Sequence, residues 1–201
     1  MDTVAIACFD GFDELDAIGP YEVFENAARA GATWDVTLRA VREGTPVTAS
    51  HGLTIEIDGS LADCTPDLLV VPGGGWTDGA GAGARAEADR GTFPDAIAAA
   101  GDAGATVAGV CTGAMLLERA GLLSGRPAVT HGDALAELRA SDATVVDARV
   151  VDDGDVLTAG GVTAGLDLAL HVVEREWGEA VADAVTTEIE YDPRGRVHQP
   201  G

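Results

Sequence analysis

The stretch that decides the fold is ATVAGVCTGAMLLERA, residues 105–120. It begins with a run of small and apolar residues, which suits a strand buried in a parallel sheet. It ends with Met115, Leu116 and Leu117, which suit the buried face of a helix. Between the two lies Cys111, with one glycine two positions before it and another two positions after it. This is the spacing of the nucleophile elbow, G-x-S-x-G, with sulfur in place of the hydroxyl oxygen.

The elbow spacing predicts a chemical role for Cys111. A sharp turn from strand to helix forces the central residue into a strained backbone conformation, and glycines on both sides remove side chains that would clash. The thiol then projects from the carboxyl edge of the sheet, beside the unpaired N–H groups of the new helix. Because these groups and the helix dipole favour the thiolate, we expect a lowered pKa for Cys111. The alternative is a small buried apolar side chain, a common fate of a lone cysteine.

The composition limits the class of protein. The chain has 201 residues, of which 46% are hydrophobic, enough for one domain whose core needs no disulfide. The three cysteines, Cys8, Cys64 and Cys111, are odd in number and lack CxxC spacing, so we expect neither a disulfide scaffold nor a zinc site. A reducing, cytoplasmic location suits them. The sequence contains no leader pattern and no run of about 18 apolar residues, so we expect no membrane span.

The net charge is the second informative property. There are 34 acidic and 12 basic residues, which gives −22, and every base is an arginine. Such a surface repels nucleic acids and anionic membranes, so we expect neither as a partner. The acids are spread along the whole chain, which is typical of a solvated surface. This composition resembles proteins of salt-loving archaea, and we expect salt to stabilise the fold by screening.

Strands and helices are expected to alternate along the chain. The pattern predicts an α/β fold with a mainly parallel sheet, in one domain over residues 1–201. The helix over 14–30 is expected to break or restart at Gly19-Pro20, because proline removes a backbone donor. His51 is interpreted as a solvated residue in the turn of a hairpin over 44–57. Other expectations are strands over 3–9, 34–41, 67–71, 126–130, 144–146, 149–151 and 156–158, helices over 93–103, 133–140 and 162–177, a mobile lid or a surface segment over 79–90, and a polar surface tail from about 188.

Chemistry by a thiolate needs an acid or base and donors that hold negative charge. Asp16 follows the first strand in an apolar setting, so burial would raise its pKa and keep it protonated. Its alternative role is a helix cap. His131 follows a short strand and could reach the same edge, although structural histidines are common.

Glycines also follow the strand over 67–71. Gly73 and Gly74 belong to a run of three glycines, whose bare N–H groups would lie where open α/β sheets bind ligands. The alternative is an ordinary flexible loop. Thr112, directly after the cysteine, supplies a hydroxyl group and another N–H.

Three motifs resemble the ThiJ/PfpI superfamily: GVCTGA at 109–114, VPGGG at 71–75 and TAGGVTAGLDLAL at 158–170. The resemblance implies a class I glutamine-amidotransferase-like domain, which is a flavodoxin-like three-layer sandwich and commonly a homodimer. Two further motifs, LDAIGPYEVF at 15–24 and EYDP at 190–193, are most similar to isocyanide (isonitrile) hydratases. Transcription regulators with a sensor domain share much of the pattern.

The resemblance also implies a mechanism. Cys111 would attack the carbon of an isocyanide as a thiolate, and Asp16 would protonate the partner atom. Water would then release an N-formamide, without a cofactor or a metal. The N–H groups of Gly73, Gly74 and Thr112 would line the pocket that stabilises charge. Gly132 stands where the hydratases would carry a bulky aromatic residue, which affects the substrate fit, and His131 need not act.

Two other functional hypotheses stay open. The first is glyoxalase, deglycase or peptidase chemistry, which would depend on His131 and usually on a glutamate in the place of Asp16. The second is a non-enzymatic redox or ligand sensor, because an accessible thiol of low pKa is easily oxidised. We expect no DNA-binding region, so a complete regulator is not expected.

Overall fold

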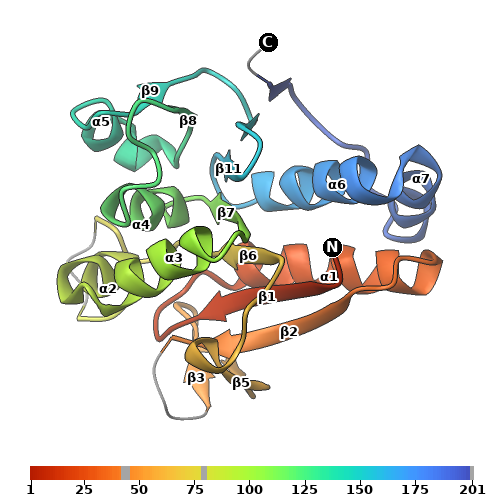
Figure 1. Ribbon diagram of the computed structural model, residues 1–201, viewed down its shortest axis with the longest axis horizontal. Helices are drawn as coiled ribbons and strands as arrows, with labels where there is room; N and C mark the ends of the chain where they lie inside the picture. The colour runs from red at the N-terminus through yellow and green to blue at the C-terminus, as the bar shows by residue number, and fades with distance from the viewer. Residues whose placement is uncertain (42–45, 78–80, 200–201) are drawn as a thin grey trace.

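The computed structural model describes residues 1–41, 46–77 and 81–199. Within these ranges eight strands form one sheet in the order β12-β10-β11-β7-β6-β1-β2-β5 (Figure 1). All neighbours in this sheet are parallel except β10 and β11. Two short pairs lie outside it: β3 with β4, and β8 with β9. The strands are β1 Thr3–Cys8, β2 Asp35–Ala40, β3 Val47–Thr48, β4 Thr54–Ile55, β5 Gly59–Ser60, β6 Leu68–Val71, β7 Thr106–Val110, β8 Pro127–Ala128, β9 Thr144–Val145, β10 Val150–Asp152, β11 Val156–Ala159 and β12 Val197–His198.

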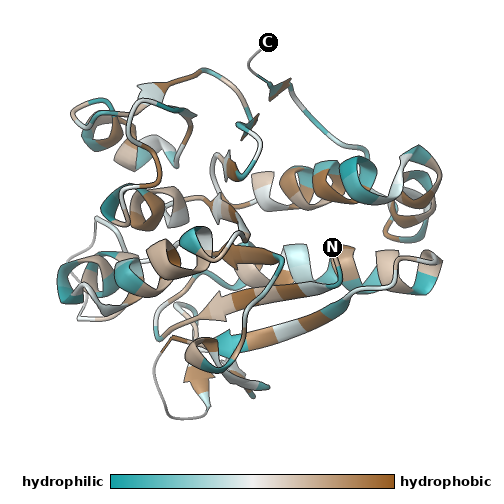
Figure 2. Cartoon of the chain, in the orientation of Figure 1, coloured by the Kyte–Doolittle hydropathy of each residue, from teal (hydrophilic) through white to brown (hydrophobic). Residues whose placement is uncertain are grey.

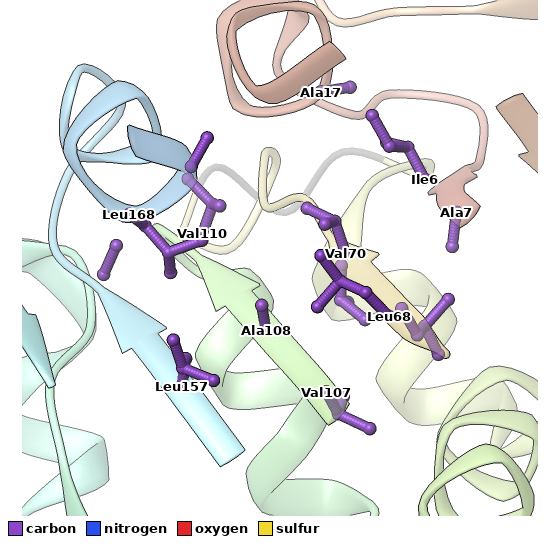
Figure 3. Packing of buried hydrophobic residues seen from close by; sticks show 14 of the residues in the cluster. Ile6, Ala7, Ala17, Leu68, Val70, Val107, Ala108, Val110, Leu157 and Leu168 are labelled. Carbon is purple, nitrogen blue, oxygen red and sulfur yellow. The ribbon is translucent and has the colours of Figure 1, made fainter. Parts of the chain in front are cut away.

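Helices cover both faces of the sheet. From β1 the chain steps outward to β2, whereas from β6 it steps the opposite way to β7, so right-handed crossovers place their helices on opposite faces. In Figure 3, Ala17 and Leu168 lie on one side of the strands, and the green helices lie on the other. The predicted α/β fold with a mainly parallel sheet is confirmed. The helices are α1 Glu14–Ala30, α2 Ala84–Arg90, α3 Thr92–Asp102, α4 Gly113–Arg119, α5 Leu135–Leu138, α6 Ala164–Trp177 and α7 Glu179–Glu188, with short 3-10 turns at Leu61–Asp63 and Gly132–Ala134.

The central strands are buried on both faces. Every residue of β6 and of β11 is buried, as the near-continuous apolar runs of a parallel sheet require. Ile6, Val70 and Ala108 lie at the centre of this core (Figure 3). Figure 2 shows hydrophobic residues along β1, whereas helix α2 carries hydrophilic turns. None of the described helices is both long and apolar enough to cross a membrane.

Helix α1 continues through Pro20, so the expected break is wrong. Asp13 caps its start by accepting the N–H of Leu15 at 3.1 Å. Gly19 and Pro20 are buried, and a Cβ atom on Gly19 would lie 3.3 Å from the side chain of Leu166 in α6. Tight packing of α1 against α6 therefore keeps the helix continuous where proline removes one backbone hydrogen bond.

Several local predictions also differ from the structure. Most of the segment predicted as a lid or a loose surface segment is ordered as helix α2, and Gly79 and Ala80 lie outside the described residues. Helix α7 was not predicted. The tail is exposed, as expected, but its strand β12 pairs with β10 at the edge of the sheet. The hairpin around His51 is confirmed by the antiparallel pairing of β3 with β4, while Gly44 and Thr45 lie outside the described residues.

Candidate active site at the carboxyl edge of the sheet

Four neighbouring strands bring the candidate site together. Strands β11, β7, β6 and β1 are adjacent and parallel, so their carboxyl ends meet at one edge. The segments that leave this edge carry Asp16, Gly73, Cys111 and the turn around Gly160. Ligands bind at this edge in open α/β sheets.

Cys111 lies in the strained turn that the glycine spacing predicts. Its φ is 56°, and Glu190 is the other non-glycine residue with positive φ in the described ranges. A Cβ atom on Gly109 would lie 2.9 Å from the backbone of Ala114, and one on Gly113 would collide with the carbonyl oxygen of Val71. Glycine is therefore required on both sides by close backbone approach, and the strain holds the thiol at the sheet edge.

Asp16 is fully buried in the first turn of α1, beside the thiol. Its Oδ2 atom accepts the N–H of Gly73 at 3.0 Å, while Oδ1 has no hydrogen-bond partner among the described residues. Burial raises the pKa of Asp16 to about 8, and the negative charge of Asp13 adds to the rise, whereas the Gly73 N–H and the Cys111 thiol lower it. At neutral pH the carboxyl group is therefore mostly protonated, as the sequence predicts.

The thiol of Cys111 is also buried. Burial raises its pKa to about 12, with a further contribution from the charge of Asp16; the backbone N–H groups of Val162 and Thr112 act in the opposite direction. The predicted lowering of this pKa is therefore wrong, because loss of water outweighs the donors at the start of α4. The contribution from Asp16 disappears when its carboxyl group is protonated. The site is thus a neutral thiol beside a neutral carboxylic acid, two groups between which a proton can move.

The glycine run after β6 serves mainly to position these groups. The N–H of Gly73 is used by Asp16, and the N–H of Gly74 donates to Oγ1 of Thr112 at 3.0 Å. Both amides are thus engaged within the protein, which differs from their expected role as donors to a substrate. The N–H of Thr112 does face the sulfur. A Cβ atom on Gly73 would lie 2.5 Å from the N and Oγ1 atoms of Thr112, so this loop and the elbow are in direct backbone contact.

His131 lies at the same edge, but the contacts of its ring indicate a structural role. Its Nδ1 atom accepts the N–H of Asp133 at 3.2 Å and so caps the short 3-10 turn. The ring packs against Gly161, where a Cβ atom would lie 2.8 Å from Cδ2. In the part of the chain that the structure describes, no hydrogen bond joins this ring to Cys111 or Asp16. The neighbouring Thr130 instead donates its hydroxyl group to the carbonyl oxygen of Cys111 at 2.9 Å.

Val162 is a site residue that the sequence analysis did not identify. It follows Gly160 and Gly161 after β11, and its backbone N–H faces the Cys111 sulfur. The signal was present, because a pair of glycines after a buried strand repeats the pattern that follows β6.

One group of side chains has the composition of a metal site. The ligand atoms of Asp13, Glu14 and His51 lie within 4.8 Å of one another. Each is already used within the protein: Asp13 caps α1, and Oε2 of Glu14 contacts Nδ1 of His51 at 2.6 Å. His51 is exposed, as predicted, but it is held by this ion pair, which also lowers the pKa of Glu14 to about 2 against the effect of its burial. These contacts account for the cluster without an ion.

Residues 2–175 match the model of the DJ-1/PfpI family. The chain belongs to this family. The resemblance inferred from the elbow and the glycine motifs is thereby confirmed, and a DJ-1/PfpI domain accounts for the arrangement of strands around Cys111.

Known members of the DJ-1/PfpI family have different roles. The chain is 35% identical over 192 residues to an isonitrile hydratase from Pseudomonas putida, covering 94% of this chain and 78% of that protein. It is 30% identical over 153 residues to the HTH-type transcriptional regulator CdhR from Pseudomonas aeruginosa, covering 73% of this chain and 42% of the regulator. A solved ThiJ/PfpI family protein from Pseudomonas syringae superimposes with a TM-score of 0.79 at 31% identity, covering 96% of this chain and 76% of that one. The homodimer and the cytoplasmic location stay predictions.

Proposed function

We propose that this protein hydrates isocyanides to N-formamides, with Cys111 as the nucleophile and Asp16 as the proton relay. The observation that carries the proposal is the buried Asp16 carboxyl group beside the Cys111 thiol, with an oxygen that forms no hydrogen bond within the described part of the chain. The similarity to an isonitrile hydratase over 94% of the chain supports it.

The reaction balances with these two groups and one water molecule. The sulfur of Cys111 bonds to the terminal isocyanide carbon while Asp16 gives its proton to the same carbon, and the thiol proton passes to Asp16. The product is a thioimidate in which the nitrogen is doubly bonded to carbon. Water then adds to that carbon as the nitrogen is protonated, and the carbon–sulfur bond breaks. An N-formamide leaves, and the thiol and the carboxylic acid are restored.

The pKa values of the site suit this sequence of steps. A neutral carboxylic acid can donate a proton to carbon at neutral pH, which an ordinary aspartate cannot do. As sulfur loses its proton, the N–H groups of Val162 and Thr112 face the negative charge that develops on it. The thiol is thus activated only when a substrate accepts the Asp16 proton.

The alternative functions find less support at this site. Glyoxalase, deglycase or peptidase chemistry would use His131 as a base. The contacts of its ring with Asp133 and Gly161 instead indicate a structural role for this histidine. A redox sensor requires a thiol that ionises readily, whereas burial raises the pKa of Cys111.

The test is hydration of para-nitrophenyl isocyanide by the purified protein in concentrated KCl, with the N-formamide quantified by chromatography and methylglyoxal as the competing substrate. We expect Cys111→Ala to be inactive and Asp16→Asn to lose about 100-fold or more in rate. His131→Ala and Cys64→Ala, the control for thiol loss away from the site, should retain activity. An active Cys111→Ala protein would contradict the mechanism. Methylglyoxal turnover without isocyanide turnover would favour the glyoxalase branch.

A further inference from the structure

The turn after β11 contacts Cys111 through its backbone. The N–H of Cys111 donates to the carbonyl oxygens of Ala159 and Gly160 at 3.1 and 3.0 Å. Two residues later comes Val162, whose backbone N–H lowers the pKa of the Cys111 thiol. Any movement of this turn therefore changes the charge environment of the thiol.

Arg149 holds this turn at both ends. Its carbonyl oxygen accepts the N–H of Gly160 at 3.0 Å. Its Nη2 atom donates to Oγ1 of Thr163 at 2.9 Å. The segment between these two contacts is the one that contains Val162, so a single residue fixes the start and the end of the turn.

Arg149 is itself held by α6 and by residues 189–199, which follow α7 and are called the C-terminal segment below. Its Nε atom pairs with Oδ2 of Asp167 at 2.5 Å, and Asp167 is buried. The hydroxyl group of Tyr191 contacts both oxygens of that carboxylate, at 3.2 and 3.1 Å, and the N–H of Arg194 donates to Oδ1 at 2.6 Å. Gly195 covers the aliphatic part of Arg149, since a Cβ atom there would lie 2.9 Å from its Cβ and Cδ atoms.

We propose that Arg149 is a positioning residue. The contacts with Asp167 and Tyr191 hold its side chain in place, and Arg149 in turn orients the Val162 N–H toward the Cys111 sulfur. This N–H then stabilises negative charge on the sulfur. The C-terminal segment thereby contributes to the site through Arg149, without a hydrogen bond from its described residues to Cys111 or Asp16. Arginine suits this task because its planar group can bind Asp167 and Thr163 at once, which a lysine ammonium on its flexible stem does less well. The inference rests on Cys111 being the reactive thiol of the proposed function, but not on the identity of the substrate.

The test is the rate at which iodoacetamide alkylates Cys111 in the intact 201-residue chain, followed by peptide mass spectrometry across a range of pH. For Arg149→Met we expect the profile to shift to higher pH, with a rate about tenfold lower at mildly alkaline pH, because a charged sulfur loses one aligned donor. Arg149→Lys should fall between the two. Among the described residues, Asp16 of α1 is the titratable side chain that shifts the pKa of the Cys111 thiol, and it is unchanged in every variant.

The matched control is Arg175→Met. Arg175 lies on α6, and it donates to Asp152 at 3.3 Å and to the carbonyl oxygen of Gly154 at 2.9 Å. Through Asp152, which accepts from Gln199 at 3.3 Å, it belongs to the second contact with the C-terminal segment. None of these bonds involves the Gly160–Thr163 turn, so we expect a wild-type alkylation profile.

The outcomes separate the inference from the proposed function. A wild-type profile for Arg149→Met, or an equal shift for Arg175→Met, would overturn the positioning role. If Arg149→Met does not fold, Thr163→Val replaces it, because that change removes the bond to the turn and leaves the pair with Asp167; a shift in the same direction supports the inference and an unchanged profile overturns it. Since alkylation needs no substrate, a protein that fails to hydrate isocyanides can still show or lack the shift.

Discussion

The carboxyl group of Asp16 lies between the Gly73 amide and the Cys111 thiol, with no exposed surface. Its pKa of about 8 means that folding takes up a proton at neutral pH, because an unfolded aspartate is ionised there. This proton is the one that Asp16 donates in the proposed reaction. Stability and activity therefore depend on pH through the same group.

The pH dependence of stability follows from this uptake. Between the ordinary pKa of 3.8 and the folded value of about 8 the native state holds one proton more than the unfolded state, so the contribution of Asp16 to stability falls as pH rises. The slope is at most about 1.4 kcal/mol per pH unit. We predict that Asp16→Asn, which preserves the acceptor for Gly73, flattens the decline of the unfolding free energy between pH 6 and 9 measured by urea denaturation. An equally steep decline in both proteins would contradict the assignment.

The charge of Asp13 is the second cause of the raised pKa of Asp16. We predict that Asp13→Asn, which retains an oxygen to cap α1, lowers the pKa of Asp16 and moves the alkaline limb of the pH–rate profile of isocyanide hydration to lower pH. The control is Asp35→Asn, an exposed acid at the start of β2 that is not among the causes of the shift at Asp16. A profile that moves equally in both variants would point to general surface charge.

At the scale of elements, the contact between the β7–α4 turn and the loop after β6 decides where the thiol lies. The residue types were predictable, because glycines at positions 109 and 113 fit only a turn without side chains. The hydrogen-bond partners of these segments could not be predicted. The use of the Gly73 and Gly74 amides by Asp16 and Thr112, and the approach of Val162, depend on segments far apart in the sequence.

Gly113→Ala tests this contact. The new methyl group would collide with the carbonyl oxygen of Val71, so we predict a loss of about 2–3 kcal/mol or more in unfolding free energy, together with loss of activity. Gly132→Ala is the control, because no atom lies within 4 Å of a Cβ there, and it should change stability by less than about 0.5 kcal/mol. Denaturant titration of both proteins gives the comparison, and similar losses in the two would refute the steric argument.

Two of the helix predictions failed for a common reason, at Gly19-Pro20 and at α7. The pattern at Gly19-Pro20 predicts a break on local grounds, but packing of α1 against α6 keeps the helix continuous. Helix α7 was missed because its small residues give a weak apolar face, and it is held by packing with α1 and α6. In both cases tertiary contact outweighs local sequence preference.

At the scale of the whole molecule, the charge of −22 is the dominant property. The described ion pairs use arginines at sites such as Arg85–Glu137 and Arg126–Asp155, which leaves a large excess of acids on the surface. The class of fold was predictable because it depends on the alternation of apolar segments along the entire chain. The pairing partners of the short strands β8, β9 and β12 could not be predicted, because two-residue strands carry no periodic signal.

Salt should therefore stabilise the protein. The Debye length falls to about 3 Å near 1 M salt, which screens repulsion between surface carboxylates. We predict that the melting temperature rises by about 5 °C or more from dilute buffer to molar KCl. An unchanged melting temperature would contradict the interpretation of the composition as an adaptation to salt, and a sucrose series controls for effects that do not depend on charge.

The C-terminal segment has a consequence for biosynthesis. Tyr191, Arg194 and strand β12 are made after every other described part of the fold, and until then Asp167 has Arg149 alone and the outer edge of β10 is unpaired. Chains emerge from the ribosome N-terminus first, so the elbow can form before the segment that steadies its neighbouring turn. A nascent chain would therefore carry an exposed strand edge, a template for aggregation, until residues 191–198 have emerged.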